Sequence, residues 1–275
     1  MNYYLLLILL LFKFQLGAQQ GNSFKFSVSP YNLLFTTVEI EDKEYTALID
    51  FGDFSTIQIS TKLIEDLHLS TDTTGILISD INGNKFPLEK GILDEMTLGE
   101  VTYDQLPFNT AKNEIKMVSD MVGTAFDVVL GFGFFKNQNF TLNFIDYQIE
   151  MQTESLSMNK NYFTCPVNTS LGYLICSVKN TNQDDINLLF DTGTPYSMID
   201  HKMVSNKNAQ LENTQGVQTF PIALYSSNQS KTFNFERSDM SALSSLSTVG
   251  IIGVNDMIGN KFTYNSQKQE LTISN

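Results

Sequence analysis

The chain has 275 residues, a formal net charge of −13, two cysteines and no tryptophan. Because attraction to nucleic-acid phosphates requires clustered Lys and Arg, and no basic stripe occurs, this charge argues against a nucleic-acid-binding protein. Phe and Tyr are abundant, and runs rich in Val, Ile and Thr are separated by Asn-Gly and Gly turns, which is typical of an all-β protein.

An apolar run at residues 5–12 is followed by Lys13 and by small residues up to Ala18. The run is too short to cross a bilayer comfortably, since a spanning helix needs about 20 apolar residues. It predicts a secretory signal peptide at residues 1–18 and a secreted or periplasmic protein with no membrane span after its removal. A retained N-terminal anchor is the alternative, because the usual positively charged start is missing. The residues that follow are enough for one large domain or two small lobes.

Two similar hairpins are predicted, at residues 33–50 and 173–191. Each shows the apolar-polar alternation of paired strands around a central turn-prone stretch. The second strand of each hairpin runs directly into an aspartate, Asp50 in the first and Asp191 in the second. The two acids therefore lie at the same place in the same supersecondary unit.

The segments 127–151 and 249–273 align without a gap when Gly131 is placed on Gly253. Five aligned pairs are then identical or similar: Phe140 with Phe262, Thr141 with Thr263, Asn143 with Asn265, Ile149 with Leu271, and Met151 with Ile273. Both segments predict a buried strand that ends in Gly, a short helical or irregular stretch and a hairpin.

These parallels predict a duplicated chain. We expect an N-terminal lobe at residues 19–155 and a C-terminal lobe at residues 156–275. The polar stretch at residues 153–160 lacks hydrophobic periodicity and provides the boundary.

The two cysteines, Cys165 and Cys176, flank another candidate hairpin. If residues 169–172 form a four-residue loop, Cys165 lies directly opposite Cys176. A cross-strand disulfide is then a candidate in an oxidising compartment. Two half-buried free thiols are the alternative.

An Asp-x-Gly sequence with a hydroxyl residue six positions after the Asp follows each hairpin. The first copy is Asp50-Phe51-Gly52 with Thr56, and the second is Asp191-Thr192-Gly193-Thr194 with Ser197. An apolar strand ending in Gly131 or Gly253 lies downstream of each copy. This order of parts resembles the aspartic protease clan, pepsin-like and retropepsin-like, in which Asp-Thr/Ser-Gly loops from two lobes meet at the centre. The resemblance covers nearly the whole chain after the signal segment.

The resemblance implies an all-β, two-lobed pepsin/retropepsin-like acid protease fold, with the active site between duplicated β-barrel-like lobes. It implies an aspartic endopeptidase in which Asp50 and Asp191 share one proton and activate a water, with no metal and no cofactor. The loop residues that support this pair are Gly52, Thr56, Thr192, Gly193, Thr194 and Ser197. A candidate flap over the substrate carries an Asn-Gly turn and consists of Asp80, Ile81, Asn82 and Gly83. The expected partner is an extended peptide or protein substrate, and the protein is expected to be a monomer.

Two residues of the first loop depart from the family pattern. Phe51 replaces the threonine whose hydroxyl braces the opposite lobe, a role that Thr192 can fill and Phe51 cannot. Asp53 stands where the family has Ala, Ser or Thr, as Thr194 does in the second loop. A third carboxylate is expected to raise at least one pKa of the pair and to move any activity toward acid pH. Alternatively, Asp53 faces solvent or caps the turn. A catalytically impaired pseudo-protease that binds extended peptides between the lobes is therefore the alternative function.

Overall fold

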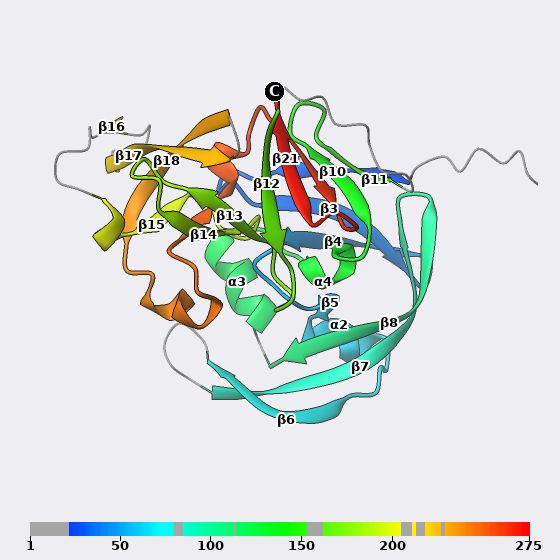
Figure 1. Cartoon of the computed structure of the whole chain (residues 1–275). Helices are drawn as coiled ribbons and strands as arrows, with labels where there is room; N and C mark the ends of the chain where they lie inside the picture. The colour runs from blue at the N-terminus through cyan, green and yellow to red at the C-terminus, as the bar shows by residue number, and fades with distance from the viewer. Residues whose placement is uncertain are drawn as a thin grey trace, which may run out of the picture.

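The computed structural model describes residues 22–79, 85–112, 114–152, 162–204, 211–212, 218–226 and 229–275. Almost all of its regular structure is β, arranged as two closed six-stranded barrels and one sheet that joins them (Figure 1). The predicted all-β, two-lobed fold is therefore confirmed. The predicted signal peptide, the boundary between residues 155 and 156, and the candidate flap residues 80–83 lie outside the described residues.

The first barrel closes because β3 pairs with both β4 and β7, the latter through Glu39 and Thr97. Its strands are, in barrel order, β3 (Leu34–Ile40), β4 (Lys43–Asp50), β9 (Val128–Gly131), β5 (Ile57–Ile59), β8 (Val101–Ala111) and β7 (Lys85–Leu98). Two further strands extend the sheet at its edges, β2 (Ser27–Val28) and β6 (Asp72–Ser79), and the helices of this lobe are α2 (Thr61–Asp66) and α3 (Glu114–Val122).

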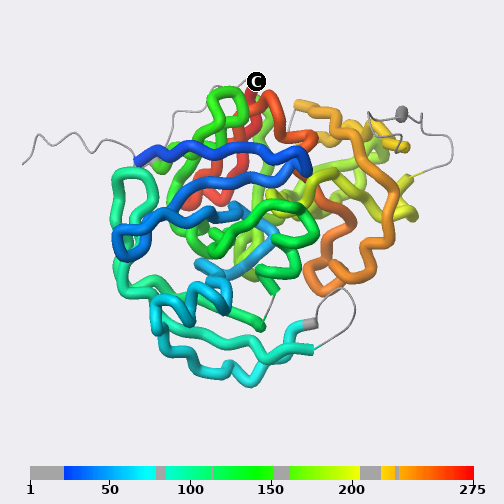
Figure 2. The backbone as a smooth tube through the Cα atoms, turned by 180° about the vertical axis from the view of Figure 1, so that it is seen from behind, coloured from blue at the N-terminus to red at the C-terminus, as the bar shows by residue number. Residues whose placement is uncertain are grey.

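The second barrel closes in the same way, through pairing of Lys179 on β13 with Tyr225 on β17. Its strands are β13 (Ile175–Lys179), β14 (Asp185–Phe190), β19 (Gly250–Ile252), β15 (Met198–Asp200), β18 (Gln229–Ser238) and β17 (Gln218–Ser226). The edge strand β16 (Leu211–Glu212) and the 3-10 helices η1 (His201–Met203) and η2 (Ser241–Leu246) complete this lobe. Figure 2 shows from behind that the yellow and orange strands of this barrel lie on the right of the molecule, whereas the cyan strands of the first barrel lie at the lower left.

The joining sheet contains strands from both halves of the chain. Its order is β1 (Ser23–Lys25), β11 (Gln148–Gln152), β10 (Asn139–Asn143), β20 (Lys261–Asn265), β21 (Glu270–Ser274) and β12 (Phe163–Asn168). At its centre Thr141 pairs with Thr263, and their hydroxyl oxygens are 2.9 Å apart. Because these residues were already equivalent in the sequence alignment, the two lobes meet symmetrically at this pair.

The strands that lead to the two aspartates are buried on both faces over their last residues, 47–49 in β4 and 188–190 in β14. β4 pairs in parallel with β9, and β14 pairs in parallel with β19. Parallel pairs of this kind require nearly continuous apolar sequence, which both halves provide before their aspartates. The short helices α4 (Phe132–Phe135) and η3 (Val254–Asp256) follow the glycines that end or follow β9 and β19, as the sequence predicted.

The predicted register of the cysteine hairpin is wrong. Val167, and not Cys165, pairs with Cys176, and Cys165 pairs instead with Leu271 of β21. The loop is longer than predicted because Asn168 and Thr169 hold an extra turn: the Asn168 side chain accepts a hydrogen bond from Ser170 N (2.9 Å). Both thiols are free and fully buried, and a side-chain hydrogen bond joins Cys176 to Cys165.

Candidate active site

The parallel strand pairs bring two equivalent loops, residues 50–56 and 191–197, to the boundary between the lobes. In the first, Phe132 N donates a hydrogen bond to the carbonyl of Asp53 (2.7 Å). In the second, Val254 N donates to the carbonyl of Thr194 (3.0 Å). These matched backbone bonds show that Asp53 and Thr194 occupy corresponding positions.

Asp50 and Asp191 meet across the boundary. Each carboxylate accepts a hydrogen bond from the backbone of the glycine two residues later, at 2.8 Å from Gly52 N and 2.7 Å from Gly193 N. The two carboxyl groups are also hydrogen-bonded to each other. The structure therefore brings together the pair that the sequence singled out.

Each aspartate lies over the glycine of the opposite loop. A Cβ added to Gly52 would lie 2.6 Å from the carboxyl group of Asp191, and one added to Gly193 would lie 2.3 Å from Asp50 Oδ1. Since any side chain at either position would displace a carboxylate, both glycines are required by close approach rather than by an unusual φ.

The surroundings of the two carboxyl groups differ. Burial raises the pKa of Asp50 well above its ordinary value, and the neighbouring charges of Asp191 and Asp53 raise it further. Burial also raises the pKa of Asp191, but hydrogen bonds from Thr194 Oγ1 (2.7 Å) and Gly193 N oppose that increase. The surroundings of the pair are therefore asymmetric: hydrogen bonds from Thr194 and Gly193 stabilise a charge on Asp191, whereas neighbouring negative charges oppose ionisation of Asp50.

Thr192 braces the two loops from one side only. Its buried hydroxyl donates to the carbonyl of Ile49 (2.8 Å) and accepts from Phe51 N (2.9 Å), so both partners belong to the first lobe. Thr192 thus makes the contacts that the resemblance implied, and the reciprocal side-chain bond from position 51 is missing because Phe51 has no hydroxyl.

Phe51 itself is fully buried in an aromatic cluster that crosses the lobe boundary. Its ring centroid lies 5.1 Å from that of Phe135 and 5.4 Å from that of Phe140, both of the first half, and 6.3 Å from that of Phe190 in the second. The side chain therefore packs away from the carboxylates and supplies apolar contact where the family has a hydrogen bond.

The other predicted support residues hold the loop ends. Ser197 is buried, and its Oγ accepts a hydrogen bond from Gly253 N (3.0 Å). In the first lobe the backbone carbonyl of Thr56 accepts from Gly131 N instead (3.3 Å). The two hydroxyl residues are thus equivalent in position, but their contacts to the downstream glycine use different atoms.

Phe54 and Tyr173 form an aromatic pair beside the dyad that the sequence did not reveal. Phe54 is 49% exposed, and its ring packs edge-to-face on Tyr173 of the other lobe, with centroids 5.9 Å apart. The backbone at Gly172 also lies against Phe54, since a Cβ added to Gly172 would lie 3.1 Å from the Cβ of Phe54. Burial raises the pKa of the Tyr173 phenol, as do the charges of Asp53, Asp50 and Asp191.

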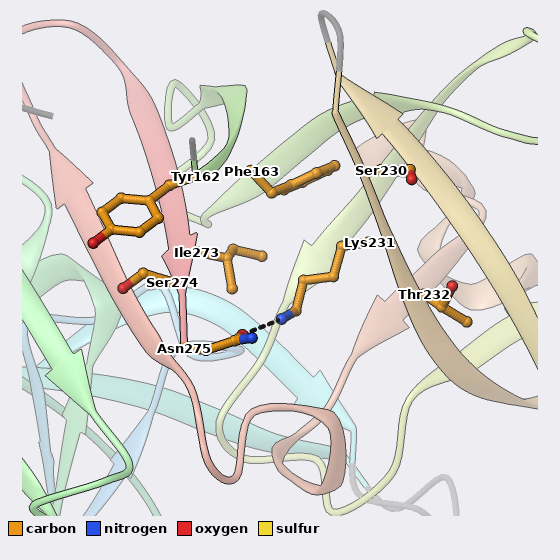
Figure 3. Close-up of a pocket in the computed structure, with 8 residues that line it drawn as sticks. All are labelled: Tyr162, Phe163, Ser230, Lys231, Thr232, Ile273, Ser274 and Asn275. Atoms are coloured by element: carbon orange, nitrogen blue, oxygen red, sulfur yellow. Dashed lines mark hydrogen bonds between the residues drawn. The ribbon is translucent and has the colours of Figure 1, made fainter. Parts of the chain in front are cut away.

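Two pockets formed by described residues lie outside these loops. One, of about 540 Å³, is lined by Tyr162, Phe163, Ile273 and Lys231, whose Nζ lies 3.3 Å from Asn275 Oδ1 (Figure 3). The other, of about 490 Å³, lies between α2 and α3. Within the described ranges no group of His, Cys, Asp and Glu is arranged to hold a metal ion, and no helix is long and apolar enough to cross a membrane.

Two closed barrels whose Asp-x-Gly loops meet at a shared sheet define a two-lobed, retropepsin-like fold. Residues 36–134, most of the first lobe, match the family model described as aspartyl protease. This match supports an aspartic protease family of the retropepsin-like kind, as the resemblance predicted, and aspartic peptidase function in general, with peptides as the substrate class. No curated protein matches the chain.

Proposed function

We propose that this protein is an aspartic endopeptidase in which Asp50 and Asp191 activate a water molecule. The observation that carries the proposal is the pair of hydrogen-bonded carboxyl groups, each lying over the glycine of the opposite lobe. Two carboxyl groups this close share one proton, because both cannot ionise together. This is the state that acid-base hydrolysis of a peptide bond needs.

In the proposed mechanism Asp50 holds the shared proton and Asp191 is the carboxylate. Asp191 accepts a proton from water, the water oxygen attacks the carbonyl carbon of the peptide, and Asp50 donates its proton to the carbonyl oxygen. As the C–N bond of this tetrahedral intermediate then breaks, Asp191 gives its proton to the leaving amine nitrogen, and Asp50 regains a proton from one of the two hydroxyl groups. This assignment follows from the donors around Asp191, Thr194 Oγ1 and Gly193 N, which stabilise its charge. No covalent intermediate is required.

The substrate is proposed to be an extended peptide bound between the lobes, with the hairpin of β6 and β7 acting as the flap. Ser79 pairs with Lys85 at the end of this hairpin, on either side of the segment that carries the predicted Asn-Gly turn. An extended peptide gains affinity from main-chain hydrogen bonds and selectivity from its alternating side chains. We propose a secreted or periplasmic monomer, because residues 1–18 have the pattern of a signal peptide and one chain supplies both aspartates.

The alternative is a pseudo-protease that binds peptides without cleaving them. This alternative is suggested by Phe51 and Asp53, which occupy the positions where the second loop has the hydroxyl residues Thr192 and Thr194. The dyad contacts argue against it: Asp50 and Asp191 keep closely matched bonds to their glycines, at 2.8 and 2.7 Å, despite the two changes.

The test is digestion of a mixed peptide library by the purified protein between pH 3 and pH 7, read by mass spectrometry. Asp191→Asn is expected to lower the cleavage rate by about 10²–10⁴-fold, because it removes the proton acceptor. Asp185→Asn is the matched control, since Asp185 starts the same strand with an exposed side chain and should leave the rate unchanged. Unchanged cleavage by Asp191→Asn would disprove the assigned dyad. Peptide capture without cleavage by the wild type would establish the pseudo-protease.

A further inference from the structure

Asp53 takes, in the first lobe, the place that Thr194 takes in the second. The backbone carbonyls of the two residues accept matched hydrogen bonds, but their side chains differ in what they offer the nearby aspartate. Thr194 Oγ1 donates a hydrogen bond to Asp191 Oδ2 at 2.7 Å. An ionised Asp53 has no proton to donate and brings a negative charge instead.

The Asp53 side chain is held close to the dyad. Asp53 N donates to the carbonyl of Asp50 (3.2 Å), which closes a tight turn, and Asp53 Oδ1 accepts from Ser55 N (2.8 Å). Its second oxygen, Oδ2, is buried and has no hydrogen-bond partner among the described residues. The sequence alternative in which Asp53 caps the turn is therefore correct in part, but the carboxyl group is largely removed from solvent.

Among the residues that the structure describes, four titratable groups interact with Asp53, one from its own loop and three from elsewhere in the molecule. They are the two dyad carboxyls, Glu114 at the start of α3, and the phenol of Tyr173. Burial raises the pKa of Asp53, more than its hydrogen bonds from Ser55 and Gln58 lower it. Above that pKa, Asp53 adds a negative charge next to Asp50.

We propose that Asp53 is a positioning residue that acts through its charge, keeping the shared proton on Asp50 to higher pH than a hydroxyl residue at the same position would. This inference rests on the proposed function of the dyad. The active pair carries one proton, and it loses activity on the alkaline side when Asp50 ionises. A neighbouring negative charge makes that ionisation harder and raises the pH at which it occurs. The fall of kcat/KM on the high-pH side of the pH profile, here called the alkaline limb, therefore moves up toward neutral pH. The shift toward acid pH expected from the sequence has the wrong sign.

The test compares the pH dependence of kcat/KM for the wild type with three variants of residue 53. Asp53→Thr copies Thr194 and is expected to move the alkaline limb to lower pH by about one unit, since it removes a charge and adds a donor. Asp53→Asn removes only the charge and should give a smaller shift in the same direction. Asp53→Glu keeps the charge and should restore the wild-type limb. Asp66→Asn, an exposed residue of α2 in the same lobe, is the control for loss of one charge and should not move the limb.

A second measurement keeps this proposal separate from the proposed function. Titration of the aspartate carboxyl carbons by NMR follows Asp50 whether or not the protein cleaves peptides, and its assignment is made with Asp50→Asn. The titration of Asp50 is expected to fall by about one pH unit in Asp53→Thr. An unchanged or raised titration would overturn the role of Asp53, even in an active peptidase. A lowered titration in a protein without cleavage would support it while refuting the peptidase.

Discussion

In the second Asp-x-Gly loop, the hydroxyl groups of Thr192 and Thr194 both donate hydrogen bonds where the two loops meet, whereas the same positions in the first loop hold Phe51 and Asp53. The second loop therefore stabilises the dyad by donated hydrogen bonds, to the carbonyl of Ile49 and to the carboxylate of Asp191. The first loop contributes an apolar ring and a negative charge. Since matched hydrogen bonds hold the backbone carbonyls of Asp53 and Thr194, the difference between these two positions lies in side-chain chemistry.

This division gives each loop one role in the proposed mechanism. The loop rich in donors belongs to Asp191, the proposed proton acceptor, whose charge it stabilises. The loop with the extra carboxylate belongs to Asp50, the proposed proton donor, whose charge it opposes. A symmetric pair would have to acquire this asymmetry from the substrate, whereas here the sequence difference between the lobes provides it in advance.

The largest effect is expected when Phe51 is replaced by Thr to make the first loop like the second. Truncating a fully buried Phe costs about 3–5 kcal/mol, and the new hydroxyl can recover about 1 kcal/mol through a reciprocal brace. The free energy of unfolding, measured by urea denaturation, should therefore fall by about 2–4 kcal/mol. The change is not expected to increase activity.

Phe54→Thr is the matched control for this variant, because Phe54 lies in the same loop with about half of its side chain exposed. It should cost less than about 1 kcal/mol. If Phe51→Thr were as stable as the wild type, the aromatic cluster would not be what stabilises the first loop.

An intermediate effect is expected when the brace is removed from the second loop by Thr192→Val. The carbonyl of Ile49 and the N–H of Phe51 would both lose a buried partner, which costs about 1–3 kcal/mol. Because the brace positions both loops, cleavage should also slow, by up to about 10²-fold for a displacement near 1 Å. Urea denaturation and kcat measure the two effects separately.

Thr192→Ser retains the hydroxyl and is the control, expected to lie close to the wild type in both measurements. Equal behaviour of the Val and Ser variants would mean that packing of the side chain, and not its hydrogen bonds, holds the loops together.

Local patterns were sufficient to predict the strands but not the partners of their side chains. The hairpin that leads to Asp50 was predictable because its alternation has period two and its turn residues, Glu41 and Asp42, adopt the positive φ that such turns require. The packing of Phe51 was not predictable, because Phe135, Phe140 and Phe190 are 84 to 139 positions away in the sequence. From the sequence alone, Phe51 is only a lost hydroxyl, since its apolar partners become neighbours only after folding.

The error in the cysteine register has a similar cause. A four-residue loop was the simplest choice for the segment before Ile175, but Tyr173 is instead drawn toward Phe54 in the other lobe. This longer loop makes a contact between lobes that no pattern within the hairpin encodes. The same contact explains why Tyr173 was missed as a neighbour of the dyad.

The smallest effect is expected at this Phe54–Tyr173 contact, which joins the two unlike loops beside the dyad. An edge-to-face aromatic pair contributes about 0.5–1.5 kcal/mol beyond its buried area, and the exposure of Phe54 favours the lower part of that range. A double-mutant cycle of Phe54→Ala and Tyr173→Ala, measured by urea denaturation, should give a coupling energy of about 0.5–1 kcal/mol. A cycle of Phe54→Ala with Tyr162→Ala, whose ring lines the distant pocket of Figure 3, should give no coupling. Equal coupling in the two cycles would show that the lobes communicate through general stability and not through this aromatic contact.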